Sequence, residues 1–103
     1  MIKVRITKAQ SDIVEFSVKG HAESDEYGKD LVCAAVSAIS LGLCNAMDIL
    51  TEEKEISARD NHVKIKVSKP DFETNTILNT GLIQLRTIRE KYPENIEIKI
   101  TEV

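Results

Sequence analysis

Tryptophan is absent from this chain of 103 residues, and only four of its residues are aromatic: Phe16, Tyr27, Phe72 and Tyr92. A hydrophobic core must therefore be built from aliphatic side chains. Hydrophobic residues make up 42% of the chain and charged residues 30%, a balance typical of a globular protein. The length predicts one domain over residues 1–103.

An excess of positive charge is also missing, since 14 Lys and Arg stand against 17 Asp and Glu, a formal net charge of −3. Nucleic-acid-binding surfaces are usually basic, so direct binding to nucleic acid is not expected. The first residues lack the basic and apolar segments of a signal peptide, and polar residues interrupt the longest apolar run, 31–50. We therefore expect a cytoplasmic protein that does not associate with a membrane.

Cysteine and histidine are scarce, with two of each: Cys33, Cys44, His21 and His62. The two cysteines fall on one predicted helix, where a rise of about 1.5 Å per residue would separate them by about 16 Å. That distance excludes a disulfide within the chain. The cysteine spacing does not match that of a metal-binding pair either, so we predict no metal and no other cofactor.

Five segments alternate apolar and polar residues as strands do: residues 2–7, 13–19, 55–59, 62–68 and 95–101. In the last of them, Ile96, Ile98 and Ile100 are expected to face inward. Helical spacing predicts two long helices, over residues 30–51 and 71–92.

The resulting order ββαββαβ predicts an α/β fold, a two-layer sandwich of a mixed or antiparallel sheet and two long helices. The first helix is apolar around most of its circumference. We therefore expect it to be central and covered on more than one side.

The segment from Gly20 to Ser37, GHAESDEYGKDLVCAAVS, carries the residues best suited to chemistry. His21 follows a predicted strand, and Cys33 is predicted to lie in the first turn of the first helix. Unpaired N–H groups and the helix dipole at that position favour a thiolate and could stabilise an oxyanion. A histidine within reach could accept the thiol proton. The pattern indicates a cysteine nucleophile with a histidine base.

Each of these residues also has a purely structural interpretation. Cys33 could be a small buried hydrophobic residue, as free cysteines usually are, and His21 could be a surface residue. Asp30 is either an N-cap or first-turn residue that stabilises the helix start, the interpretation we favour, or it orients His21 as the third member of a triad. His62 starts a strand beside a turn without an evident partner, so we interpret it as a surface histidine.

Candidate substrate-binding residues surround the predicted nucleophile: Gly20, Asp30, Ala34 and Ser37. Glycine and alanine allow a substrate to approach closely, and Ser37 lies one turn from Cys33, where it could form a hydrogen bond.

Two more small residues, Ser40 and Cys44, share that helical stripe, and for them we favour close packing against the sheet. Residues 22–29 are polar, largely acidic and include Gly28, so they are predicted to form a loop. It is either a solvated surface or a lid over an extended peptide.

Gly20-His21-Ala22, the loop with Gly28, and DLVCAAVS from Asp30 to Ser37 resemble the bacterial ribosomal-processing cysteine protease (Prp) family. The resemblance implies an endopeptidase of the bacterial cytoplasm with His21 as base and Cys33 as nucleophile. It also implies a homodimer with a mobile loop over the substrate. Members of this family remove a short N-terminal extension from the precursor of large-subunit ribosomal protein twenty-seven. They cut after bulky apolar residues and before a small one.

Two other functions remain open from the residues alone. A chain of this size with charged faces could be a non-enzymatic ribosome-associated binding or assembly module. Cys33 could instead be a redox thiol, but it would need a resolving partner from a second subunit, because Cys44 is too far along the helix.

Overall fold

The computed structural model describes residues 1–20 and 29–103. These residues form five strands and two helices in the order β1 (Ile2–Ala9), β2 (Asp12–Lys19), α1 (Lys29–Leu50), β3 (Ile56–Arg59), β4 (His62–Lys66), α2 (Phe72–Lys91) and β5 (Ile96–Glu102). The predicted α/β class and element order are confirmed, with boundaries that differ by one or two residues.

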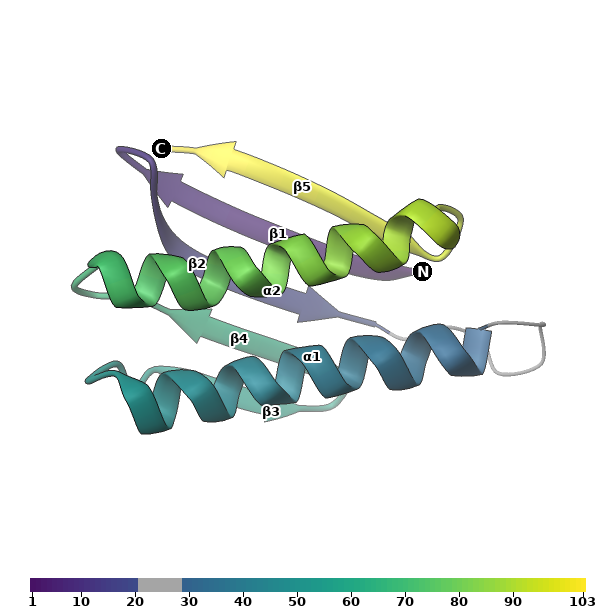
Figure 1. Cartoon of the computed structure of the whole chain (residues 1–103), viewed down its shortest axis with the longest axis horizontal. Coiled ribbons are helices and arrows are strands. Elements are labelled where there is room, and N and C mark those ends of the chain that lie inside the picture. The colour runs from purple at the N-terminus through teal and green to yellow at the C-terminus, as the bar shows by residue number, and fades with distance from the viewer. Residues whose placement is uncertain (21–28) are drawn as a thin grey trace.

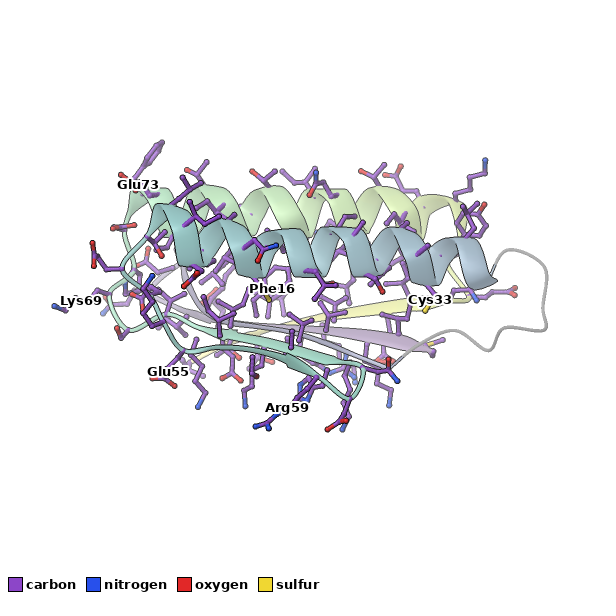
Figure 2. All side chains as sticks on the ribbon, turned by 90° about the horizontal axis from the view of Figure 1, so that it is seen from below. Phe16, Cys33, Glu55, Arg59, Lys69 and Glu73 are labelled. Carbon is purple, nitrogen blue, oxygen red and sulfur yellow. The ribbon has the colours of Figure 1, made fainter. Side chains whose placement is uncertain are left out.

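The strands form one mixed sheet in the order β3-β4-β2-β1-β5. All neighbouring strands are antiparallel except β1 and β5, which are parallel. Both helices lie on the same face of the sheet, α1 over β3 and β4 and α2 nearer to β2 and β1 (Figure 1). Figure 2 shows the resulting two layers, with Phe16 between them.

The core between the layers is aliphatic apart from Phe16, because alternate residues of each strand point toward the helices. In β5 the predicted inward pattern holds for Ile96, which is buried, and in part for Ile98. Ile100 pairs with the buried Ile6 and so lies on the same inward face, but its side chain is 39% exposed. The C-terminal end of this edge strand extends beyond the cover of α2 (Figure 1).

Left-handed backbone conformations close both hairpins. Gln10 and Ser11 have φ values of 52° and 71°, and Asp60 and Asn61 have values of 53° and 58°. Two-residue turns of this kind match the twist of antiparallel strands. The predicted turn at Asp60–Asn61 is therefore confirmed.

Gly20 ends β2, as the sequence predicts, with a φ of 92°. Its N–H donates a hydrogen bond to the carbonyl of Asn61 at 2.9 Å. The end of β2 is thereby tied to the β3–β4 turn. Both lie at the end of the molecule where α1 begins (Figure 1).

Helix α1 is covered on two sides, by the sheet and by α2, but its third side is exposed through Leu31, Leu41 and Ile49. The expectation of a central helix is therefore wrong, since α1 lies over the β3 side of the sheet. By length and composition alone, Leu31–Leu50 could cross a membrane, with a mean hydropathy of 1.7. Core helices of soluble proteins share that property, and 33% of this apolar segment is buried here.

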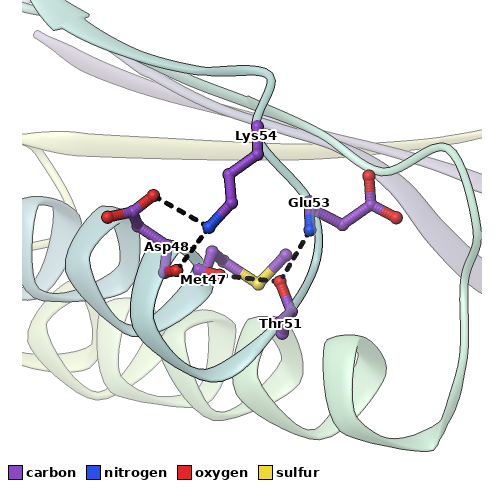
Figure 3. A network of polar contacts seen from close by, with 5 residues as sticks. All are labelled: Met47, Asp48, Thr51, Glu53 and Lys54. Atoms are coloured by element: carbon purple, nitrogen blue, oxygen red, sulfur yellow. Dashed lines mark hydrogen bonds and ion pairs between the residues drawn. The ribbon is translucent and has the colours of Figure 1, made fainter.

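Polar contacts terminate α1 and direct the chain toward β3 (Figure 3). The hydroxyl of Thr51 donates to the carbonyl of Met47 at 2.7 Å and accepts from the N–H of Glu53 at 3.1 Å. The ammonium group of Lys54 donates to the carbonyl of Asp48 at 2.7 Å. A cation at this end satisfies a carbonyl that the helix leaves unpaired.

Candidate active site

Cys33 projects from α1 toward the sheet near the beginning of the helix (Figure 2). Its side chain is half-buried and lines a cavity of about 210 Å³ between α1, the end of β2 and the β3–β4 hairpin. The walls include the apolar side chains of Val18, Val36 and Val63. A cavity of this size can hold one large side chain beside the thiol.

The two cysteines have different environments although they share a helix. Both are free thiols, as predicted. Cys44 is only 8% exposed, and burial raises the pKa of its thiol despite an opposing backbone hydrogen bond. A buried thiol with a raised pKa forms little thiolate near neutral pH, and the thiolate is the nucleophile. Cys33 is therefore the thiol that a substrate can reach.

Helix α1 begins at Lys29, so Asp30 already has helical backbone and lies in the first turn. Of the two positions predicted for Asp30, N-cap or first turn, the structure has the first turn. Cys33 consequently falls at the start of the second turn, so its predicted place in the first turn is wrong. From that position on, backbone N–H groups donate to carbonyls within the helix. The expected oxyanion donors directly after Cys33 are therefore already used.

His21 lies outside the described residues, as does the predicted loop as far as Gly28. Gly20, the residue before His21, lines the cavity together with Cys33.

His62 is half-buried, and its Nε2 lies 3.1 Å from the hydroxyl of Ser17, so the expectation that it lacks a partner is wrong. It pairs across the β3–β4 hairpin with Arg59, which points away from the helices (Figure 2). Directly paired residues share a face of the sheet. The imidazole of His62 therefore lies on the face opposite Cys33, although His62 also contributes to the cavity rim.

The other candidate residues are placed as follows. Gly20 and Ser37 line the same cavity as Cys33, whereas Ala34 is exposed and lies outside it. The side chain of Asp30 is outside the described part of the chain.

Several cavity residues escaped the sequence analysis because they come from the β3–β4 hairpin, among them Ala58 and Asn61. No local pattern marks them, because the pairing of β4 with β2 is what brings the hairpin beneath α1. Ser40 is buried, at 2% exposure, as expected, and it also lines the cavity. Among the described residues, no group of three His, Cys, Asp or Glu side chains could hold a metal ion.

The family model of the cysteine protease Prp matches residues 1–97. The chain is 41% identical over 103 residues to a ribosomal processing cysteine protease Prp of Staphylococcus aureus, an alignment that covers 95% of this chain and 97% of that protein. It is also 41% identical over 107 residues to the Bacillus subtilis protein of the same name, with 95% and 96% covered.

Solved structures of the Staphylococcus aureus protease share the fold. Its complex with a covalently linked product peptide has a TM-score of 0.86 at 39% identity, with 98% of this chain and 100% of that chain covered. Its complex with a substrate peptide has a TM-score of 0.82 at 35% identity, with the same coverage.

These similarities extend over nearly the full chain. The chain thus has the fold of a protease, and within that fold an accessible thiol lines a cavity. A non-enzymatic binding module does not account for them. The chain belongs to the cysteine protease Prp family, and it is a cysteine protease.

Proposed function

We propose that this protein is an endopeptidase of the bacterial cytoplasm that removes the N-terminal extension of large-subunit ribosomal protein twenty-seven. Two kinds of similarity support a role in ribosomal protein processing. Relatives 41% identical to this chain are named ribosomal processing proteases, and the Staphylococcus aureus structures contain substrate and product peptides. The finer assignment, a cut after bulky apolar residues and before a small one, rests on the motifs between Gly20 and Ser37.

The observation that carries this proposal is the position of Cys33, a half-buried thiol that lines a cavity with both apolar and polar walls. We assign it the role of nucleophile. Cys44 is a poor alternative because its thiol is buried and its pKa is raised by that burial.

We assign the base to His21. The chain contains two histidines, and the strand pairing of His62 directs its imidazole to the face of the sheet that the helices leave uncovered. The effect of the helix dipole is strongest within the first turn, and Cys33 lies beyond that turn. We therefore attribute most of the activation of the thiol to His21.

The reaction follows from these two roles. His21 removes the thiol proton as the sulfur of Cys33 attacks the scissile carbonyl carbon. The tetrahedral intermediate breaks the C–N bond, and the imidazolium gives its proton to the leaving amine. A water molecule, deprotonated by His21, then hydrolyses the thioester and regenerates the thiol.

Two pairs of matched variants test this assignment on a peptide with an apolar-then-small junction. We expect Cys33→Ala to abolish cleavage and His21→Ala to lower kcat/KM by about 10²–10⁴-fold, the usual contribution of a general base. Peptide cleavage followed by mass spectrometry measures both effects.

The matched controls are Cys44→Ala and His62→Ala, which alter the same residue types. Cys44 is buried, and the imidazole of His62 lies on the opposite face of the sheet from Cys33, although His62 contributes to the cavity rim. We expect both to keep kcat/KM within a few-fold of the wild type. Cleavage by Cys33→Ala, or equal losses in His21→Ala and His62→Ala, would contradict the assigned roles.

We also propose that the protein is a homodimer. The exposed side of α1 is a stripe of apolar and small side chains: Leu31, Ala34, Ala38, Leu41 and Ile49. We call this stripe the outer α1 face; its five side chains are uncharged, and Asp48, seven residues after Leu41, adds one exposed carboxylate at its edge. A twofold axis would place the same face of a second copy against it.

A further inference from the structure

The two helices cover one face of the sheet and leave the other face open (Figure 2). Residues that pair directly across neighbouring strands share a face, so the strand register identifies the side chains that point away from the helices. We call this surface the open sheet face. Seven of its side chains are Lys or Arg: Lys3, Arg5, Lys19, Arg59, Lys64, Lys66 and Lys99.

Positive charge is concentrated on the open sheet face. It holds seven of the 14 Lys and Arg but two of the 17 Asp and Glu, namely Glu15 and Glu97, which gives it a formal charge of +5. Glu55 borders the face just before β3. The net charge of −3, from which we expected no binding to nucleic acid, averages over this face and an acidic remainder. The strand pairing thus creates a basic surface on an acidic protein.

One row of these side chains crosses four strands at the end of the sheet near the cavity of Cys33. Successive direct pairs join Lys3 of β1, Lys19 of β2, His62 of β4 and Arg59 of β3. Neighbouring strands lie about 4.8 Å apart, so the row is about 14 Å long. Arg59 and His62 also line the cavity that contains Cys33. The basic row therefore reaches the rim of the candidate active site.

The register opposes like charges within this row. Lys3 lies directly opposite Lys19, an arrangement that destabilises a strand pair. Glu97 pairs with Lys3 from β5. Its carboxylate, however, is held by Arg5 at 2.9 Å and by Lys99 at 3.8 Å. A bound anion would offset the repulsion between the two lysines.

The uncharged side chains of the open sheet face indicate which polyanion fits it. Within the described strands they are serine, threonine and histidine, and none is apolar or aromatic. Protein interfaces have an apolar core in which lysine is depleted, so an acidic protein fits poorly. Proteins that bind single-stranded RNA on a sheet stack its bases on aromatic side chains. This face therefore suits a nucleic acid duplex, whose phosphates lie on the outside.

We propose that the open sheet face binds duplex RNA through its phosphates and so holds the protease beside an RNA-bound ribosomal protein precursor. The choice of RNA over DNA rests on the proposed function, because ribosomal proteins assemble on RNA. Contacts to phosphates carry no sequence information, so binding is independent of sequence and weakens steeply with salt. The row at the cavity rim brings the bound RNA next to the site of cleavage.

Fluorescence anisotropy with a short labelled RNA duplex tests this inference. All proteins carry Cys33→Ala, so that binding is measured without catalysis. We expect Lys3→Gln/Lys19→Gln to weaken binding by about tenfold or more at low salt. The slope of log K against log salt concentration should fall by about one for each lysine removed. The matched control is Lys69→Gln/Arg86→Gln, two exposed cations outside the open sheet face, which should bind as the parent does.

The stability of the variant separates binding from folding. Lys3→Gln/Lys19→Gln removes an opposed pair of like charges, so its thermal unfolding midpoint should not fall. Arg59→Gln, at the other end of the row, is an independent variant and should lower the salt slope by about one. An unchanged slope in Arg59→Gln would overturn the inference.

Four other results would also overturn it: no binding of duplex RNA by the parent protein, equal affinities of the two double variants, a preference for the DNA duplex of the same sequence, or tighter binding to phosphatidylserine vesicles or polyglutamate. Cleavage plays no part in these measurements. A protein that binds duplex RNA but cleaves no ribosomal protein precursor would contradict the proposed function alone, and one that cleaves without binding RNA would contradict this inference alone.

Discussion

Gly20 shows how one residue can position the segment that leads into the site. Its φ of 92° lies in the left-handed half of backbone space, which residues with a Cβ rarely adopt. A Cβ added there would also lie 2.9 Å from the carbonyl oxygen of Met1. The N–H of Gly20 is held by Asn61 at 2.9 Å, so the backbone cannot shift without losing that bond. The conformation in which β2 ends therefore depends on glycine.

We predict that Gly20→Ala lowers both stability and activity. Strain of this kind typically costs about 1–3 kcal/mol. A displaced β2 end would also misplace His21, so kcat/KM should fall by more than tenfold even in the folded fraction. Urea unfolding and peptide cleavage measure the two effects.

Gly81→Ala is the matched control, since an added Cβ there would overlap the side chain of Leu43 between the two helices, far from the cavity. We expect this variant to lose stability but to keep its kcat/KM when folded. A Gly20→Ala variant with wild-type kcat/KM would show that Gly20 does not position the catalytic segment.

The connections between elements depend on the carboxylate of Glu53, which is buried in the link between α1 and β3. It accepts hydrogen bonds from the N–H of Ser68 at 2.9 Å, the hydroxyl of Ser68 at 3.0 Å and the N–H of Lys69 at 2.9 Å. Desolvation by burial raises the pKa of Glu53, but these hydrogen bonds outweigh it and hold the pKa below its usual range. One ionised side chain thus ties the end of α1 to the link between β4 and α2.

We predict that Glu53→Gln destabilises the protein at pH 7 by about 1.5–3 kcal/mol, the range for a hydrogen bond to a charged group. Because the pKa of Glu53 is lower in the folded state, its ionised form stabilises the fold above the unfolded-state pKa. That contribution is lost as the pH falls through the folded-state pKa. The stability difference between wild type and Glu53→Gln should therefore shrink below about pH 4. Denaturant unfolding from pH 7 to pH 3 measures it.

The neighbouring Glu52 is exposed and serves as the control, so Glu52→Gln should show little change at any pH. A constant difference between wild type and Glu53→Gln across this range would mean that the charge of Glu53 does not stabilise the link.

At the scale of the whole molecule, the outer α1 face stands out because it is exposed. A helix as apolar as α1 is ordinarily buried. The helix has the hydropathy of a fully buried segment, yet Leu31 and Ile49 are 62% and 76% exposed. Contiguous exposed apolar surface commonly marks an interaction site. The proposed homodimer would remove this face from water.

We predict that Ala38→Arg, in the middle of the outer α1 face, converts a wild-type dimer to a monomer. Arginine is a good helix former, so the fold should persist while two like charges oppose each other across the twofold axis. Analytical ultracentrifugation measures the mass. Thr76→Arg, on the exposed side of α2, is the control and should remain dimeric. A monomeric wild type would contradict the dimer, and a dimeric Ala38→Arg would exclude this face.

Much of the architecture could be predicted from local patterns. Strands and helices can be recognised from residues close together in the sequence. The direction of side chains repeats over a few residues in both elements, and the apolar residues follow that repeat. The turn at Asp60–Asn61 and the end of β2 at Gly20 were predictable for the same reason. The first-turn position of Cys33 was not, because the helix starts slightly earlier and several residues near its beginning could serve as its boundary.

The sequence by itself determined the element order, the α/β class and the choice of Cys33 as candidate nucleophile, since these depend on periodicity and on which reactive residues are present. Only the tertiary structure decided that Cys33 lines a cavity while Cys44 is buried, that His62 faces away from the thiol, and that Ser40 ends up with an unpaired hydroxyl. Those outcomes depend on which distant segments pack together. Burial and cavity shape arise from such long-range contacts, and no local period encodes them.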